Sequence, residues 1–396
     1  MIFSLCLIVV PSLALLTVPL TPSSKSYTNN SNTVESSTLT PEDFRIYYSI
    51  VLTKGTPGKN ISLVLDTASA WLLYFKSDNI SESSTETCYN NSTSLIYENY
   101  EFIGNLCSDK FKADELMANS QVYVEVSRQD AVFASCDGVL GLAFSRLAHG
   151  FWPFVSTLKK EGKIKEQIFS IYLGNQSYSQ NYPVMTIGGF SDDYCIGEER
   201  IIPVSSYEGH WMIDIESLGL GSDTTGFTGK GIFDSTFDAI SLPENTYNTL
   251  ISIFSQNDYN DNISYPYSFP CDYQKIHSLQ NLTLFISEHE YLITPNNYLK
   301  IQEDFCILRV TKSQNNYIRL GLPFFREYYL IFDYEVPEIL SYKAADPEKA
   351  LKFNTLYIVG IIVLGVIIII PLCFYVMLSK VQGVASEPLS YEKIPN

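Results

Sequence analysis

Two aspartates with similar surroundings are the residues of this chain best suited to chemistry. Each ends an apolar run and precedes small hydroxyl residues, as Asp66-Thr67-Ala68-Ser69 and as Asp234-Ser235-Thr236. Further along, a short motif ending in glycine follows each of them, as Val139-Leu140-Gly141 and as Arg319-Leu320-Gly321. The repetition indicates two half-chains, each of which presents one aspartate on a strand-to-loop turn.

Two carboxylates that face one water molecule can share a proton, because like charges a few ångströms apart do not both ionise easily. The ionised carboxylate takes a proton from the water, which attacks a carbonyl carbon. The protonated carboxyl donates a hydrogen bond to the carbonyl oxygen as charge develops there. A single aspartate before Thr or Ser is more often only a turn residue or a helix cap, so this hypothesis depends on the pair.

Composition indicates the elements that must position these turns. The chain has 396 residues, of which 46% are hydrophobic and 17% charged, which excludes a disordered protein. Its 28 Tyr and 23 Phe suit pleated sheets. From residue 44, turn signals separate short apolar runs such as IYYSIVLT, QVYVEV, IFSIYL and YYLIFDY. We predict an all-β fold with a few short helices, the best helical stretch being FVSTLKKEGKIKEQ.

Charge and residue usage exclude two classes of function. The formal net charge is −17 without any Lys/Arg cluster, which argues against a nucleic-acid partner. Four His and eight scattered Cys form no CxxC or HExxH motif, so we expect no metal site.

The two ends of the chain predict its topology. Residues 1–20 are apolar and broken by proline, as in a secretory signal peptide, although no A-x-A cleavage site stands out. Residues 21–43 are a polar linker. Residues 356–378 are uncharged and span about 34 Å as a helix, long enough to cross a membrane and too long for a typical core helix. Residues 379–396 are then a cytosolic tail. We expect a single-pass type I membrane protein of the secretory or endosomal pathway or the cell surface.

Cysteines and asparagines agree with a luminal compartment. Outside the two apolar ends, six cysteines remain, which suggests three disulfides with 15 possible connectivities. Eight N-x-S/T sequons lie before the predicted membrane helix. The tail sequence Tyr391-Glu392-Lys393-Ile394 is similar to a Tyr-x-x-apolar trafficking signal, with an unstructured tail as the alternative.

From residue 44 to residue 345 the chain resembles the pepsin-like aspartic endopeptidases. The matching stretches follow the family's order: YYSIVLTKGTPGKNISLVLDTASAWLL, CDGVLGLAF, FSIYLGN, VMTIGGFSDDYCIGE, GHWMIDIESLGLG, GIFDSTFDAISLP and IRLGLPFFREYYLIFDYEV. The resemblance implies a bilobal fold, with an N-terminal lobe over residues 44–203 and a C-terminal lobe over 204–345. It also implies a monomer that needs no cofactor and acts on a peptide or protein substrate.

The resemblance assigns roles to individual residues. Asp66 and Asp234 correspond to the catalytic pair, and Thr67 and Ser235 to the hydroxyls that brace the two loops. Tyr97 corresponds to the tyrosine of the substrate-binding flap, with a packed strand tyrosine as the alternative. Cys271 and Cys306 occupy the place of the family's second-lobe disulfide, and pairing of Cys88 with Cys107 and of Cys136 with Cys195 is a weaker hypothesis.

The chain departs from the family where both turns carry glycine. Ala68 and Thr236 replace the two glycines, and Ser69 keeps the hydroxyl of the fourth position, whereas Phe237 loses it. We therefore expect an intact first half-site and a damaged second one. The linker contains a single basic residue, Lys25, unlike the family's basic prosegment. These features favour an aspartic endopeptidase of a luminal or extracellular compartment, with a catalytically inactive peptide- or protein-binding membrane protein as the alternative.

Overall fold

The computed structural model describes residues 15–24, 46–76, 83–97, 100–127, 135–174, 183–205, 209–256, 267–302 and 304–345. The expected membrane helix at 356–378, the tail with Tyr391 and most of the expected signal peptide and linker lie outside these ranges. Within them, no helix has both the length and the apolar character needed to span a membrane.

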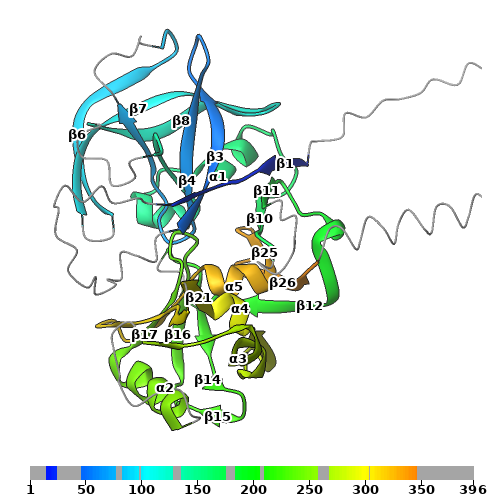
Figure 1. The fold of residues 1–396 in the computed structure, drawn as a ribbon. Coiled ribbons are helices and arrows are strands. Elements are labelled where there is room, and N and C mark those ends of the chain that lie inside the picture. The colour runs from blue at the N-terminus through cyan, green and yellow to red at the C-terminus, as the bar shows by residue number, and fades with distance from the viewer. Residues whose placement is uncertain are drawn as a thin grey trace, which may run out of the picture. The chain divides into compact units, whose positions relative to one another are not determined.

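The first half of the chain builds an eight-stranded sheet in the order β2-β3-β4-β9-β5-β8-β7-β6. Figure 1 shows β3, β4, β6, β7 and β8 gathered at one end of the ribbon. Its strands are β2 (Thr21–Ser24), β3 (Ile46–Lys54), β4 (Lys59–Asp66), β5 (Leu72–Lys76), β6 (Thr87–Tyr97), β7 (Tyr100–Ala113), β8 (Leu116–Ser127) and β9 (Gly138–Gly141).

The second half builds three smaller sheets of five, four and three strands. The five-stranded sheet, β13-β16-β24-β17-β23, carries the second aspartate turn. Its strands are β13 (Met212–Ile215), β16 (Gly229–Phe233), β17 (Ile240–Pro243), β23 (Val310–Ser313) and β24 (Ile318–Leu320). The other two sheets contain β14 (Ser217–Leu220), β15 (Asp223–Thr224), β19 (Leu282–Ile286) and β20 (His289–Ile293), and β18 (Ser268–Pro270), β21 (Leu299–Gln302) and β22 (Phe305–Leu308).

A six-stranded sheet, β1-β11-β10-β25-β26-β12, joins strands from both halves of the chain. Its core includes the stacked rings of Phe169 and Phe332, whose centroids are 4.7 Å apart, and the fully buried Trp211. The strands are β1 (Leu16–Pro19), β10 (Ile168–Tyr172), β11 (Val184–Ile187), β12 (Cys195–Pro203), β25 (Tyr328–Asp333) and β26 (Glu338–Ala344).

Residues 16–24, which the sequence assigns to the end of a signal peptide and the start of a linker, form two short strands. Strand β1 pairs with β11, and β2 pairs with β3. Leu16 and Val18 pack against the main core. An alternating apolar stretch serves equally well as an edge strand, which is why the pattern suited both interpretations.

The helices are few and short, as predicted. They are α1 (Phe154–Lys160), α2 (Glu244–Gln256), α3 (Tyr273–Ser278), α4 (Pro295–Tyr298) and α5 (Leu322–Glu327), with 3₁₀ helices η3 (Ser145–Ala148) and η4 (Asp192–Tyr194). Helix α2, with 13 residues, was not predicted. It buries Tyr247, Leu250 and Phe254 on one face, but its Asn, Thr and Ile residues have weak helix propensity, so packing decides its conformation.

The internal duplication predicted from the two aspartate motifs is confirmed by strand pairing. Strand β4, which ends at Asp66, is parallel to β9, and β16, which precedes Asp234, is parallel to β24. In both halves, the glycine that ends the short apolar motif, Gly141 or Gly321, allows another segment of backbone to approach closely. A Cβ on Gly141 would lie 2.5 Å from the carbonyl carbon of Ala70, and one on Gly321 would lie 2.0 Å from the carbonyl oxygen of Phe237.

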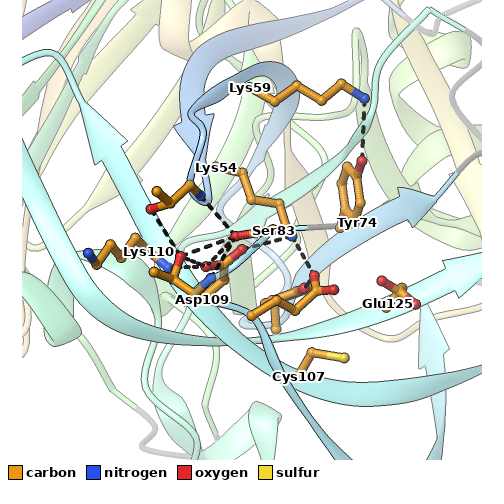
Figure 2. Close-up of polar contacts among 12 residues, drawn as sticks. Lys54, Lys59, Tyr74, Ser83, Cys107, Asp109, Lys110 and Glu125 are labelled. Carbon is orange, nitrogen blue, oxygen red and sulfur yellow. Dashed lines mark hydrogen bonds and ion pairs between the residues drawn. The ribbon is translucent and has the colours of Figure 1, made fainter. Parts of the chain in front are cut away.

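A buried lysine ties β3 to the β6–β7 hairpin. The Nζ of Lys54 lies 2.6 Å from Glu86 Oε1 and 3.1 Å from Asp109 Oδ2, and the Lys54 side chain is 8% exposed. Figure 2 shows Lys54 and Asp109 pointing toward one another within this network. Burial raises the pKa of Asp109, but hydrogen bonds from Thr85, the Lys110 N–H and Lys54 outweigh it and leave the pKa lowered.

Replacing this lysine tests how far the hairpin depends on it. Lys54→Met should lower the free energy of unfolding by about 3–5 kcal/mol, because two buried carboxylates lose their cation. Lys230→Met, which breaks an exposed pair with Asp214, is the control and should cost about 1 kcal/mol or less. Chemical denaturation of both variants checks the difference, and equal losses would contradict it.

The contribution of the Lys54 ion pairs to the free energy of unfolding depends on pH. The pKa values of Glu86 and Asp109 are both lowered in the folded protein, so their contribution is complete above about pH 4.5 and is lost as the pH falls through the folded values. The stability difference between the wild type and Lys54→Met should therefore shrink on acidification below that pH.

Candidate active site

The two aspartate turns are joined by reciprocal hydrogen bonds between their second residues. Thr67 Oγ1 donates to the Phe233 carbonyl at 2.9 Å and accepts from the Ser235 N–H at 3.0 Å. Ser235 Oγ donates to the Leu65 carbonyl at 2.8 Å and accepts from the Thr67 N–H at 3.1 Å. Thr67 is fully buried and Ser235 is 3% exposed. These four bonds bring together two turns that lie about half a chain apart.

The first turn holds Asp66 through backbone N–H groups. Asp66 Oδ1 accepts from the Ala68 N–H at 2.8 Å and from the Ser69 N–H at 3.2 Å. Ala68 keeps the N–H that glycine would supply. The Ser69 hydroxyl, expected to reach the carboxylate, is buried and has no hydrogen-bond partner within the described part of the chain. The backbone, and not that hydroxyl, therefore positions Asp66.

The second turn holds Asp234 in a different way from the one expected. Asp234 Oδ1 accepts from both the N–H and the Oγ1 of Thr236, at 2.8 Å and 2.7 Å. Thr236 is 6% exposed, so its branched side chain fits the site. The hydroxyl missing at Phe237 is thus supplied one residue earlier. The second turn therefore has its own set of hydrogen bonds to Asp234, and the expected damage to its activity stays a prediction.

The other oxygen of Asp234 is paired with an arginine. Arg319 Nε donates to Asp234 Oδ2 in a short charge-assisted bond, and the guanidinium carbon lies 4.6 Å from the centre of the Phe237 ring. Strand β24 places Arg319 opposite Ile232 of β16, next to the second turn. The sequence analysis treated Arg319 only as part of a glycine motif. A charged residue within an otherwise apolar strand is the sequence signal that could have identified Arg319 as a candidate site residue.

A second ion-pair cluster anchors the far end of the same loop. Asp238 Oδ1 lies 2.7 Å from Arg326 Nη1 and 3.1 Å from Arg309 Nη1, and all three side chains are at least 94% buried. Burial lowers the pKa of Arg309 to about 10, with Arg326 adding to this effect and Asp238 opposing it. Sequence reasoning missed this cluster, because its three residues lie in separate segments of the chain and Arg309 belongs to none of the quoted motifs.

The backbone position of Tyr97, the expected flap residue, is described. Tyr97 ends β6 and pairs with Tyr100 of β7, so it lies at the end of a long hairpin. Glu98 and Asn99 lie outside the described residues. A cavity of about 450 Å³ lies on this hairpin and β8, with Lys76, Ile103, Asn105 and Glu125 in its lining, and includes neither catalytic candidate.

The structure confirms two of the three predicted disulfides and contradicts the third. Cys271 bonds to Cys306, as the resemblance implies, and Cys88 bonds to Cys107 across the hairpin. Cys136 and Cys195 are not bonded to each other, so their proposed disulfide is wrong. Burial raises the pKa of Cys136 and, with nearby acidic residues, raises that of Cys195 to about 12. Cys88 and Cys107 also lie near Glu125, but their sulfurs are engaged in the disulfide and cannot bind a metal.

Comparison with known proteins adds to this geometry. Residues 47–342 match the family model described as eukaryotic aspartyl protease. The probable vacuolar protease A of Trichophyton verrucosum is 25% identical over 70% of this chain and 74% of its own length. Pepsin A of Sus scrofa is 25% identical over 70% and 76%, and rhizopuspepsin-1 of Rhizopus niveus is 27% identical over 74% and 77%. The crystal structure of an aspartic proteinase from Irpex lacteus superposes with a TM-score of 0.67 at 17% identity, covering 84% of this chain and 98% of its own.

The bridge between the turns can be tested by an isosteric change. Thr67→Val should lower the free energy of unfolding by about 2–5 kcal/mol, because the buried Phe233 carbonyl and Ser235 N–H each lose a partner. Thr249→Val removes an exposed hydroxyl from α2 and should change stability by about 0.5 kcal/mol or less. Thermal and denaturant unfolding of both variants would contradict the bridge if the losses were equal.

Proposed function

The chain belongs to the eukaryotic aspartyl protease family, and on that premise we propose that Asp66 and Asp234 form the catalytic dyad of an aspartic endopeptidase. The observation that carries this proposal is the reciprocal bonding of Thr67 and Ser235, which holds both aspartate turns against each other. Both aspartates are almost completely buried. Their carboxylates are held by donors from their own turns.

The mechanism uses these two groups and one water. One carboxylate accepts a proton from the water, which attacks the carbonyl carbon of a peptide bond. The carboxyl that carries the shared proton donates to the carbonyl oxygen as negative charge develops. The donors from Ala68, Ser69 and Thr236 hold the carboxylates before substrate binds, so little reorganisation is needed during the reaction.

A second function is favoured by one specific observation. Arg319 occupies Asp234 Oδ2, the oxygen that Thr236 leaves for chemistry. A protein in which this pair never opens would bind peptides between its lobes without cleaving them. The same fold supports both functions, and turnover distinguishes them.

We further propose that the protein is a membrane-anchored glycoprotein of a luminal compartment. Support comes from the apolar ends of the chain, the two disulfides and the sequon at the exposed Asn60. Because β1 begins at Leu16, a signal peptide that ended at residue 20 would remove a strand of the six-stranded sheet. Cleavage after Ala14 would retain that strand. Ser12, two residues before Ala14, is small, as is typical of signal-peptide cleavage sites.

Substitution of either aspartate tests the dyad. Asp66→Asn and Asp234→Asn should each reduce kcat at least about 1,000-fold on a mixed peptide library at acidic pH, because one carboxylate cannot both activate water and protonate the carbonyl. Each change is nearly isosteric, so the variants should remain folded. Undiminished cleavage by a folded variant would show that the chemistry lies elsewhere.

Topology has its own test. Glycosidase treatment should lower the apparent mass of the native protein, and protease added outside sealed vesicles should remove only the C-terminal tail. N-terminal sequencing of the mature chain should start at or before Leu15. Digestion of the bulk with protection of the tail would reverse the orientation.

A further inference from the structure

Arg319 is the part of the second half-site that solvent can reach. Its side chain is 27% exposed, whereas the side chain of Asp234, with which it pairs, is fully buried. The backbone of Arg319 is held in β24 between Ile232 of β16 and Ser241 of β17. The strand is therefore fixed, while the long side chain can change its partner.

The pair with Arg319 engages the oxygen of Asp234 that catalysis needs. Two donors from Thr236 already engage Oδ1, and Arg319 engages Oδ2. A water molecule or a peptide carbonyl that uses Oδ2 must compete with a charge-assisted hydrogen bond, which is about twice as strong as a neutral one. A substrate that offers Arg319 a replacement partner removes this competition.

We propose that Arg319 determines specificity by selecting peptides that carry an acidic side chain beside the scissile bond, whose carboxylate takes the guanidinium from Asp234. This inference rests on the proposed function. A guanidinium forms two parallel hydrogen bonds with a free carboxylate, and Nε, the atom that donates to Asp234 Oδ2, is part of the donor fork that makes them. The Phe237 ring beneath the guanidinium provides a surface on which it can rest.

The other arginines near this turn cannot play the same part. Arg309 and Arg326 are 5% and 1% exposed, and both pair with Asp238. Moving either of them would leave a buried carboxylate with less compensation. Arg319 is thus the cation at the second turn, among the described residues, that combines exposure with contact to a catalytic candidate.

Matched peptides test this inference by binding and by cleavage. The ligands are pairs of non-cleavable hydroxyethylene peptide analogues. The two members of a pair differ only by Glu or Gln at the positions on either side of the scissile bond. Cleavable peptides of the same sequences serve as the substrates. The proteins are the full chain in detergent, Arg319→Leu, Arg319→Lys and the control Lys230→Gln, which removes an exposed lysine charge from β16 of the same lobe.

The wild type and Lys230→Gln should bind the Glu analogue at least about tenfold more tightly than the Gln analogue and show the same preference in kcat/KM. Arg319→Leu should lose the preference and cleave the Gln peptide faster than the wild type does. Arg319→Lys should keep part of the preference, because the charge remains without the planar fork.

The outcomes separate this inference from the proposed function. Cleavage by the wild type with equal affinity for Glu and Gln ligands overturns the inference and leaves the endopeptidase intact. A Glu preference in binding, lost in Arg319→Leu, without cleavage by any variant, overturns the endopeptidase and supports Arg319 as the acid-recognising residue. If Arg319→Leu does not fold, the wild-type comparison of Glu and Gln ligands still decides, since equal binding contradicts the inference.

Discussion

The exchange of hydrogen bonds between Thr67 and Ser235 is the constraint on which the rest of the site depends. Each hydroxyl bonds to the backbone of the opposite turn, so neither turn can shift without leaving buried polar groups unpaired. The parallel pairs β4–β9 and β16–β24 bring both aspartates to this junction. The close packing at Gly141 and Gly321 then leaves no room for a side chain behind either turn.

The second half-site is a consistent alternative to the family's turn. Thr236 supplies a hydroxyl to one oxygen of Asp234, Arg319 pairs with the other oxygen, and Phe237 supports the arginine. Thr236 and Arg319 each contact the carboxylate of Asp234, and Phe237 contacts the guanidinium of Arg319. These contacts show how both departures from the glycine turn coexist with a fully buried aspartate.

Each lobe contains a cluster of buried ion pairs that holds a segment connected to the candidate site. In the first lobe, Lys54 joins β3 to the hairpin that ends at Tyr97. In the second lobe, Asp238 joins the aspartate loop to Arg309 and Arg326. A buried charge without its partner is costly, so these clusters favour one arrangement of the loops over others. Rigidity of this kind suits a site in which two carboxylates must be held close together.

The sequence by itself determined the features that local motifs carry. The positions of Asp66 and Asp234 on strand ends, the internal duplication and the predominance of short strands all follow from residue type and spacing, and the structure agrees with them. These features are readable because strand alternation and turn chemistry act over a few neighbouring residues.

Only the tertiary structure decided which side chains meet across the chain. The pairing of Arg319 with Asp234 joins residues 85 positions apart, and the Asp238 cluster joins three separate segments of the chain. Strand β1 joins a sheet by pairing with β11, and Cys136 and Cys195 form no disulfide with each other although the even number of cysteines suggested one. These outcomes depend on contacts between distant segments, whose geometry is set by packing and hydrogen bonding and has no signature in local sequence.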